Sequence, residues 1–315
     1  MTLIGSTARA HEALDCAVVW TLMLALLAAA STNTGDEAEV QAFRREREQR
    51  LRAPDGWLAL VGLAWLHPGA NRFGSAPDDE VRMPAAVPPH AGTLFVDGKT
   101  VRAAIAPGVA ATLNGRRWDA TGPVALRSDA GDATPDIVGV GAVTLQVIDR
   151  GGRLGARLKD PDSEARRSFG GLSYYPFDPA YRVTARLRRA PAPTKMVIPD
   201  ASGGRQEMQS PGTLAFTLLG RRLALDPVND GPDDDNLLVV FRDPTSGRET
   251  YAGGRFLRAR RAKGASDDAW VVDFNQAYNP PCAFTPYATC PLPPPQNRLP
   301  LPIPAGEKAP AGAAH

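Results

Sequence analysis

Residues 143–159 read VTLQVIDRGGRLGARLK, in which two runs of strand-forming residues flank Gly151-Gly152. Two glycines between such runs are typical of a β-hairpin, because its tight turn requires positive φ at both central positions. The same arrangement recurs around Asp97-Gly98 and Asn114-Gly115. These turns predict neighbouring antiparallel strands.

Short strand-like segments recur along the rest of the chain. Residues 182–187 alternate apolar and polar side chains, which is typical of a half-buried strand. Residues 57–66, WLALVGLAWL, fit either a buried strand or a short helix. Further strand-like runs lie at 213–218, 222–225, 237–241, 249–252, 255–258 and 270–274. The sequence therefore predicts a mainly β fold: an antiparallel β-sandwich or a partly open β-barrel built from hairpins.

One helix is predicted near the N-terminus. Residues 36–52 are rich in helix formers and contain neither Gly nor Pro. The basic stretch at 44–52 is interleaved with Glu46 and Glu48, and we interpret it as a solvent-facing surface of this helix. We expect a helix and linker at 31–56, a single β-rich domain at 57–308 and a flexible tail at 309–315.

The N-terminus carries an apolar run of 14 residues at 17–30. A spanning helix needs about 20 residues, so this run suits the apolar region of a secretory signal, and its terminal alanines suit cleavage. We expect residues 1–30 to be a signal segment and the protein to be exported, either periplasmic or secreted. The alternatives are a membrane anchor at 17–30 and a cytosolic protein. Beyond this segment we expect no membrane contact.

The composition and motifs of the chain bear on which partners and cofactors we expect. The chain of 315 residues is 43% hydrophobic, enough for a core, and its formal net charge is +2. A nearly neutral chain has no global field for nucleic acid, so we expect no nucleic-acid partner. The chain contains no P-loop, GxGxxG or GxSxG motif and its four histidines are scattered, so we expect no cofactor and no metal. No pattern indicates an oligomeric state.

Two cysteines remain if Cys16 leaves with the signal segment. Cys282 and Cys290 form an even pair, which in an oxidising compartment predicts a disulfide closing a loop of nine residues. Free thiols are the alternative. A metal site is disfavoured because no CxxC spacing occurs.

Polar residues gather near the end of the last predicted strand. Asp273 and Asn275 lie on one face of that strand, and Tyr278 and Asn279 follow it. They fit a ligand site, or hydrogen bonds to the irregular backbone that follows, whose prolines donate none. The proline-rich residues 291–304 predict an extended C-terminal strap.

The strap carries Asn297 and leads to Glu307 and Lys308, which fit an ion pair or a site carboxylate. Arg255 fits either a bidentate anion contact or an internal partner such as Asp243 or Asp273.

A further charged group surrounds a proline-containing turn. It comprises Arg157, Asp160, Asp162 and Arg167. This group predicts either a salt-bridged corner or a rim that binds an anion or a sugar.

From Trp57 to Lys308 the chain resembles the family known as domain of unknown function 1684. Four stretches carry the resemblance: Trp57–Leu66, Arg157–Pro176 (RLKDPDSEARRSFGGLSYYP), Phe241–Leu257 (FRDPTSGRETYAGGRFL) and Asp273–Lys308. The resemblance implies membership of this family and directs attention to these stretches. It implies no activity.

The sequence leaves three functions open. The first is an exported protein that binds a small or extended ligand, saccharide or peptide, in a cleft near the C-terminal stretch. Its candidate ligand-binding residues are Arg255, Asn275, Asn279, Asn297, Lys308 and Arg167. The second is a hydrolase or lyase with a carboxylate acid or base, and the third is an envelope structural protein.

For the enzyme, Asp273 or Glu307 would be the general acid or base, Tyr251 or Tyr278 the proton donor, and Arg255 the stabiliser of negative charge. The C-terminal stretch contains no histidine, which argues against a serine or cysteine triad there.

Overall fold

The computed structural model describes residues 34–131, 134–229 and 236–310. The chain forms two compact units, Met1–Arg45 and Glu46–His315. Residues 34–52 are helical, which confirms the N-terminal helix. The expected signal segment lies outside the described residues. Within the described ranges, no helix combines the length and apolar character needed to cross a membrane.

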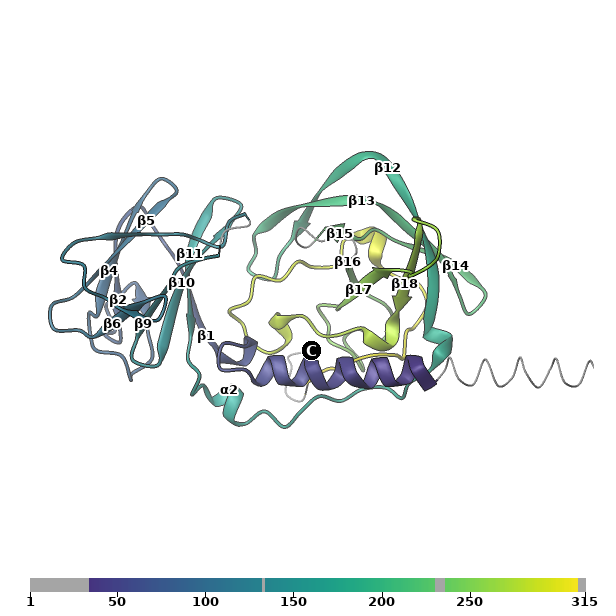
Figure 1. Ribbon diagram of the computed structural model, residues 1–315, viewed down its shortest axis with the longest axis horizontal. Coiled ribbons are helices and arrows are strands. Elements are labelled where there is room, and N and C mark those ends of the chain that lie inside the picture. The colour runs from purple at the N-terminus through teal and green to yellow at the C-terminus, as the bar shows by residue number, and fades with distance from the viewer. Residues whose placement is uncertain (1–33, 132–133, 230–235, 311–315) are drawn as a thin grey trace, which may run out of the picture. The chain divides into compact units, whose positions relative to one another are not determined.

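Two sheets form the first half of the second unit (Figure 1). Their shared core includes Phe73, Leu94, Val138 and Leu158, so they pack as a sandwich. One sheet has the order β1 (Leu60–Trp65), β11 (Arg153–Lys159), β10 (Val143–Arg150), β9 (Ile137–Val140), β6 (Ala111–Leu113), β7 (Arg116–Arg117). The other has the order β3 (Val81–Arg82), β2 (Gly69–Gly74), β4 (Gly92–Asp97), β5 (Thr100–Ile105), β8 (Val124–Leu126).

The three predicted hairpins are confirmed. Gly151 and Gly152 both have positive φ and join β10 to β11, with Arg150 opposite Arg153. Asn114 and Gly115 both have positive φ between β6 and β7. Between β4 and β5 the hairpin forms one residue later than the predicted turn: Asp97 pairs with Thr100, so the turn residues are Gly98 and Lys99, and of these Gly98 alone has positive φ. Residues 57–66 contain both predicted alternatives: the single 3₁₀ turn η1 (Trp57–Ala59) precedes strand β1.

A seven-stranded antiparallel sheet forms the second half of this unit. Its core includes Trp270, Phe241 and Phe274, the last two with ring centroids 5.5 Å apart. The order is β14 (Arg221–Leu225), β13 (Arg205–Leu218), β12 (Arg182–Pro199), β18 (Ala269–Asp273), β17 (Arg255–Arg261), β16 (Asn236–Phe241), β15 (Val228–Asn229). The mainly β, sandwich-like fold is therefore confirmed, and the strands of the described residues form no closed barrel. Strands β2 and β3 pair in parallel, whereas the hairpins predict antiparallel pairs only.

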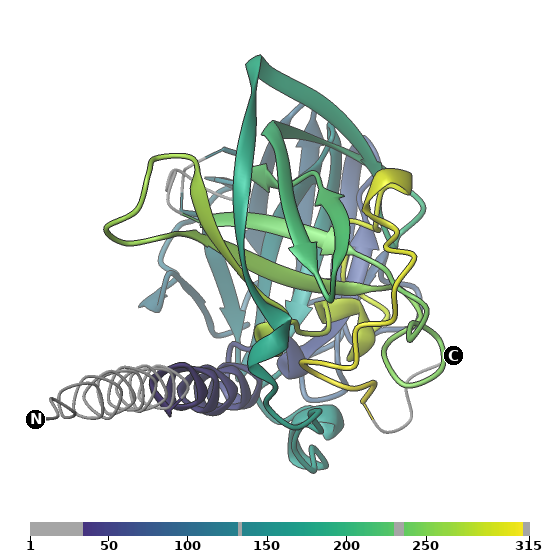
Figure 2. The same ribbon diagram turned by 90° about the vertical axis from the view of Figure 1, so that its right-hand side faces the viewer.

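Residues 274–308, called the strap from here on, cross the seven-stranded sheet and include the proline-rich residues 291–304. They contain three 3₁₀ turns: η3 (Phe274–Gln276), η4 (Pro281–Ala283) and η5 (Pro295–Asn297). Figure 2 shows the strap in yellow alongside the strands. Backbone hydrogen bonds fasten it: Leu292 donates to Pro199 over 2.8 Å and Leu299 to Arg242 over 2.7 Å. Its many prolines cannot donate, so the few available N–H groups are used at these contacts.

Candidate functional site

The carboxylate of Asp273 is enclosed by donors. It accepts hydrogen bonds from Arg182 Nη1 (2.8 Å), from Gln276 Nε2, and from the backbone and side-chain nitrogens of Asn275 (both 3.0 Å). The Asn275 side chain also exchanges two hydrogen bonds with the backbone of Asp178. Both residues are buried. These contacts tie the end of β18 to the backbone at Asp178, and one of them, from the Asn275 N–H to Asp273, goes to the irregular backbone that follows the strand.

A second buried group joins the helix to the strap. Glu307 Oε1 accepts from Asn279 Nδ2 over 2.7 Å, and Oε2 lies 3.3 Å from Arg47 Nε. Arg47 also donates to the Asn279 carbonyl and lies over the Tyr278 ring. Burial raises the pKa of Glu307, and Arg47 opposes that rise. Asn279 Nδ2 donates as well to the Lys308 carbonyl.

The interpretation of residues 44–52 as a solvent-facing surface is wrong for Arg47, which is buried. Its partners lie more than 230 positions away in the sequence. A charge pattern on one helix holds no information about such partners, so no local signal could have found this contact.

Arg255 and Asn297 hold the strap in place. Arg255 is fully buried, and its Nη2 donates to Asp243 Oδ1 (3.1 Å) and to the Ile303 carbonyl (2.9 Å). Of the partners weighed for this arginine, the structure shows Asp243. Asn297 donates to the carbonyls of Asp226 and Val240, both over 2.9 Å.

The remaining predicted residues lie apart from one another. Tyr251 donates to the Cys282 carbonyl over 3.1 Å, and burial raises its pKa. The Lys308 ammonium lies 4.7 Å from the centre of the Tyr175 ring. Arg167 is exposed and donates to the backbone carbonyl of Asp162. The structure brings together Asp273 with Asn275, and Asn279 with Glu307 and Lys308.

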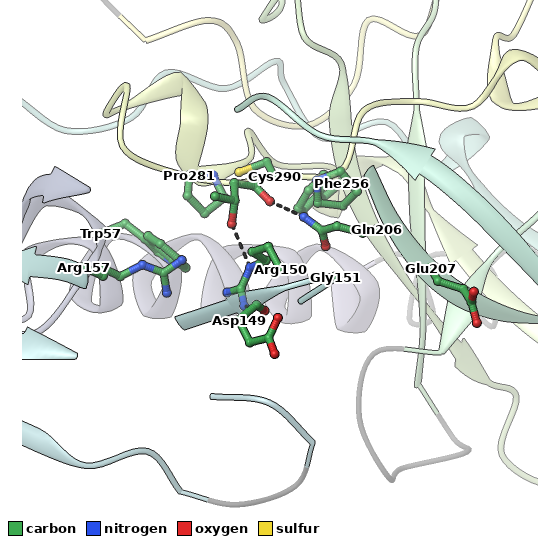
Figure 3. Close-up of a pocket in the computed structure, with 12 residues that line it drawn as sticks. Trp57, Asp149, Arg150, Gly151, Arg157, Gln206, Glu207, Phe256, Pro281 and Cys290 are labelled. Carbon is green, nitrogen blue, oxygen red and sulfur yellow. Dashed lines mark hydrogen bonds between the residues drawn. The ribbon is translucent and has the colours of Figure 1, made fainter. Parts of the chain in front are cut away.

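A pocket of about 440 Å³ lies beside the strap, between strands β10 and β11 and strand β13 (Figure 3). Its wall combines aromatic, polar and cationic side chains with two acidic ones, Asp149 and Glu207. Those that matter for its chemistry are Trp57, Arg150, Arg157, Gln206, Phe256 and Thr289.

Arg157 is the unusual group in this pocket. Its strand β11 lies between β1 and β10, and only 8% of its side chain is exposed. Its Nε is buried without a hydrogen-bond partner, and the structure shows no hydrogen bond from its guanidinium to any residue that it describes. The nearest carboxylate oxygen, Asp129 Oδ2, is 4.0 Å away. Burial lowers the pKa of Arg157 to about 10, and repulsion from Arg150 adds to the effect.

The other polar groups in the pocket have partners. Arg150 binds both oxygens of Asp129 (2.9 and 2.8 Å) and donates from Nε to Thr289 Oγ1 (3.0 Å). Gln206 donates to the Thr289 carbonyl over 2.6 Å. Asp129 therefore pairs mainly with Arg150, and the positive charge of Arg157 is only weakly neutralised.

Trp57 and Phe256 supply the apolar part of the wall. The Arg157 guanidinium carbon lies 5.4 Å from the centre of the Trp57 ring, a cation–π distance that also orients the cation. The sequence places Arg157 in the charged group around the 160–162 turn, where an anion-binding rim was one of two alternatives.

The two predicted disulfide partners are free thiols in the structure. The Cys282 backbone N–H lies 3.2 Å from Cys290 Sγ, and Cys290 lines the pocket. Among the described residues there is no group of three or more His, Cys, Asp or Glu that could hold a metal ion.

Comparison with known families adds a family assignment. The family described as "Protein of unknown function (DUF1684)" matches residues 167–308. The chain belongs to this family. The match begins later than the resemblance, which starts at Trp57, so it covers the seven-stranded sheet and strap but not Arg157.

Two solved structures are similar to parts of this DUF1684 protein. One is the solution NMR structure of an uncharacterized protein from Haloarcula marismortui, with 36% identity over 45% of this chain and 78% of that chain, and a TM-score of 0.39. The other is the crystal structure of the FhaA FHA domain complexed with the intracellular domain of Rv3910. It has 16% identity over 30% of this chain and 96% of that chain, and a TM-score of 0.21. No curated protein matches the sequence.

Proposed function

We propose that this DUF1684 protein binds a small organic anion in the pocket beside the strap, with Arg157 as the residue that contacts the negative charge. The observation that carries the proposal is a guanidinium with 8% of its side chain exposed that lines a pocket and makes no hydrogen bond to any described residue.

The pairing of charges around the pocket supports an anion at Arg157. Asp129 is bound by Arg150, and of the two carboxylates in the pocket wall, Glu207 pairs with Lys195 over 2.7 Å and Asp149 accepts from the Gly152 N–H over 2.6 Å. The nearest carboxylate oxygen to Arg157 is 4.0 Å away, so the positive charge of Arg157 lacks a close partner. A buried charge without a close partner costs several kcal/mol. A carboxylate, phosphate or sulfate can accept two parallel hydrogen bonds from a guanidinium, so it would supply the missing partner.

The shape of the pocket narrows the ligand. A volume of about 440 Å³ is within the range for small-molecule sites. Trp57 and Phe256 favour an apolar or planar group next to the anion. Among the saccharides and peptides that the sequence leaves open as ligands, a pocket of this kind favours those that carry an acidic group.

The apolar run at residues 17–30 supports an inference about the compartment in which the protein acts. We infer that residues 1–30 direct export, which would place the pocket outside the cytoplasm, where small ligands are captured from the surroundings. Cell fractionation with the full chain, compared with a variant lacking residues 17–30, tests this: the first is expected outside the cytoplasm and the second inside.

Binding is tested by calorimetry with benzoate and phenyl phosphate, with benzyl alcohol as the uncharged control. We expect both anions to bind and the alcohol not to bind. Arg157→Met should weaken anion binding by at least about tenfold, since one charge-assisted hydrogen bond is worth about 1.5–3 kcal/mol.

Arg153→Met is the matched control, because Arg153 is exposed on the same strand and lies over the Trp65 ring, outside the pocket. It should bind like the wild type. Equal binding by wild type and Arg157→Met, or tighter binding of the alcohol than of benzoate, would overturn the proposal.

A further inference from the structure

Two thiols lie together where the strap passes the pocket. Cys282 belongs to η4 and is partly exposed. Cys290 is buried and lines the pocket (Figure 3). The Cys282 backbone N–H donates to Cys290 Sγ over 3.2 Å. The fold therefore holds both sulfur atoms at one place, within reach of each other.

The two thiols differ in reactivity. The hydrogen bond from Cys290 lowers the pKa of Cys282 because it stabilises the thiolate, and the Tyr251 hydroxyl adds to this effect. The same bond, together with burial, raises the pKa of Cys290. Cys282 is also the more accessible of the two. A thiolate is the attacking form in disulfide exchange, so Cys282 is the better nucleophile.

We propose that Cys282 and Cys290 form a thiol–disulfide exchange site, in which Cys282 attacks a disulfide oxidant and Cys290 resolves the mixed disulfide. In the first step the Cys282 thiolate bonds to one sulfur of the oxidant, and the other sulfur leaves as a thiolate. In the second step Cys290 loses its proton, attacks Cys282 Sγ and expels the second thiolate. Two protein thiols lose two electrons, and one disulfide becomes two thiols.

Oxidation has a structural consequence. The bond would close a loop of nine residues that contains Thr289, a residue of the pocket wall. Closing a loop restricts the unfolded chain, so the oxidised protein should melt several degrees higher than the reduced protein. This inference does not require that the pocket binds an anion.

The test uses the full chain with Cys16→Ser, so that only the two thiols of the site are counted. The reduced protein is treated with oxidised glutathione and followed by thiol titration and mass spectrometry. We expect both thiols to disappear without a retained glutathione. In the same background, Cys290→Ser should retain one glutathione on Cys282.

Cys282→Ser is the matched variant, and its remaining thiol should react at least about tenfold more slowly, because Cys290 is buried and its thiolate is disfavoured. Three outcomes would overturn the proposal: the wild-type pair stays reduced, each cysteine retains its own glutathione, or the two single variants react at equal rates. The melting temperatures of reduced and oxidised protein give an independent readout of loop closure.

Discussion

Two buried arginines show how differently this chain treats the same side chain. Arg255, on β17, makes three hydrogen bonds, to Asp243 and to the carbonyls of Ile303 and Ala305, although its Nε has no partner. Arg157, on β11, makes none to the described residues, and its nearest carboxylate is 4.0 Å away and already bound to Arg150. One guanidinium is neutralised by the fold. The other is neutralised only in part.

The comparison separates structural from functional polar groups. Burial and charge alone do not distinguish the two arginines, since both are more than nine-tenths buried. What differs is whether the protein supplies the partners. A residue whose partners are all internal maintains the fold, and a residue whose partners are missing beside a pocket is available for a ligand.

The largest effect should follow from breaking the neutralised pair. Arg255→Met leaves the buried Asp243 carboxylate without its cation and two carbonyls of the strap without a donor. We expect a loss of about 3–5 kcal/mol in the free energy of unfolding, measured by urea denaturation. Arg222→Met, at an exposed position of β14, is the control and should change stability by less than about 0.5 kcal/mol. A loss below 1 kcal/mol for Arg255→Met would show that the two arginines do not differ as described.

The opposite result is expected for the other arginine. Arg157→Met removes a buried, weakly paired cation and keeps much of the apolar stem, so the free energy of unfolding should stay unchanged or rise by up to about 2 kcal/mol. The same urea experiment measures it, in buffer without phosphate or other multivalent anions. A loss of 2 kcal/mol or more would mean that the fold itself uses the charge of Arg157.

The ion pair between Arg127 and Asp136, near the surface, should give the smallest change in the free energy of unfolding, and that change should depend on pH. Arg127 donates to both oxygens of Asp136 and, with Asn114, holds the pKa of Asp136 well below its usual range. A carboxyl whose pKa is lowered by folding stabilises the protein above its unfolded pKa, and that contribution is lost as the pH falls through the folded value.

Asp136→Asn should therefore be slightly less stable than the wild type at neutral pH, and the difference should shrink as the pH falls below about 4. Urea midpoints measured across this range give the result. A difference that does not vary with pH would mean that the Asp136 charge contributes nothing.

Much of the fold could be predicted from local sequence. Glycine or asparagine at the turns between β4 and β5, β6 and β7, and β10 and β11 determines hairpins, because few residues adopt positive φ. Proline at 291–304 determines an extended strap in the same way, since each ring restricts φ. The pairing of β12 with β18, some 90 positions apart, has no such local signal.

The candidate site was much harder to predict. Asp273, Asn297 and Arg255 have the chemistry of site residues, and the sequence identifies them as polar groups near the strap. Whether such a group is satisfied depends on atoms brought from elsewhere: Arg182 for Asp273, Val240 for Asn297 and Asp243 for Arg255.

The sequence alone determined the β class, the turns, the helix at 34–52 and the stiffness of the strap, because backbone preferences act over a few residues. Only the tertiary structure decided which charges are neutralised. Asp129 reaches Arg150 and leaves Arg157 short of a partner through contacts between three separate segments. Electrostatic neutralisation depends on distance in space, and a one-dimensional pattern does not record that distance.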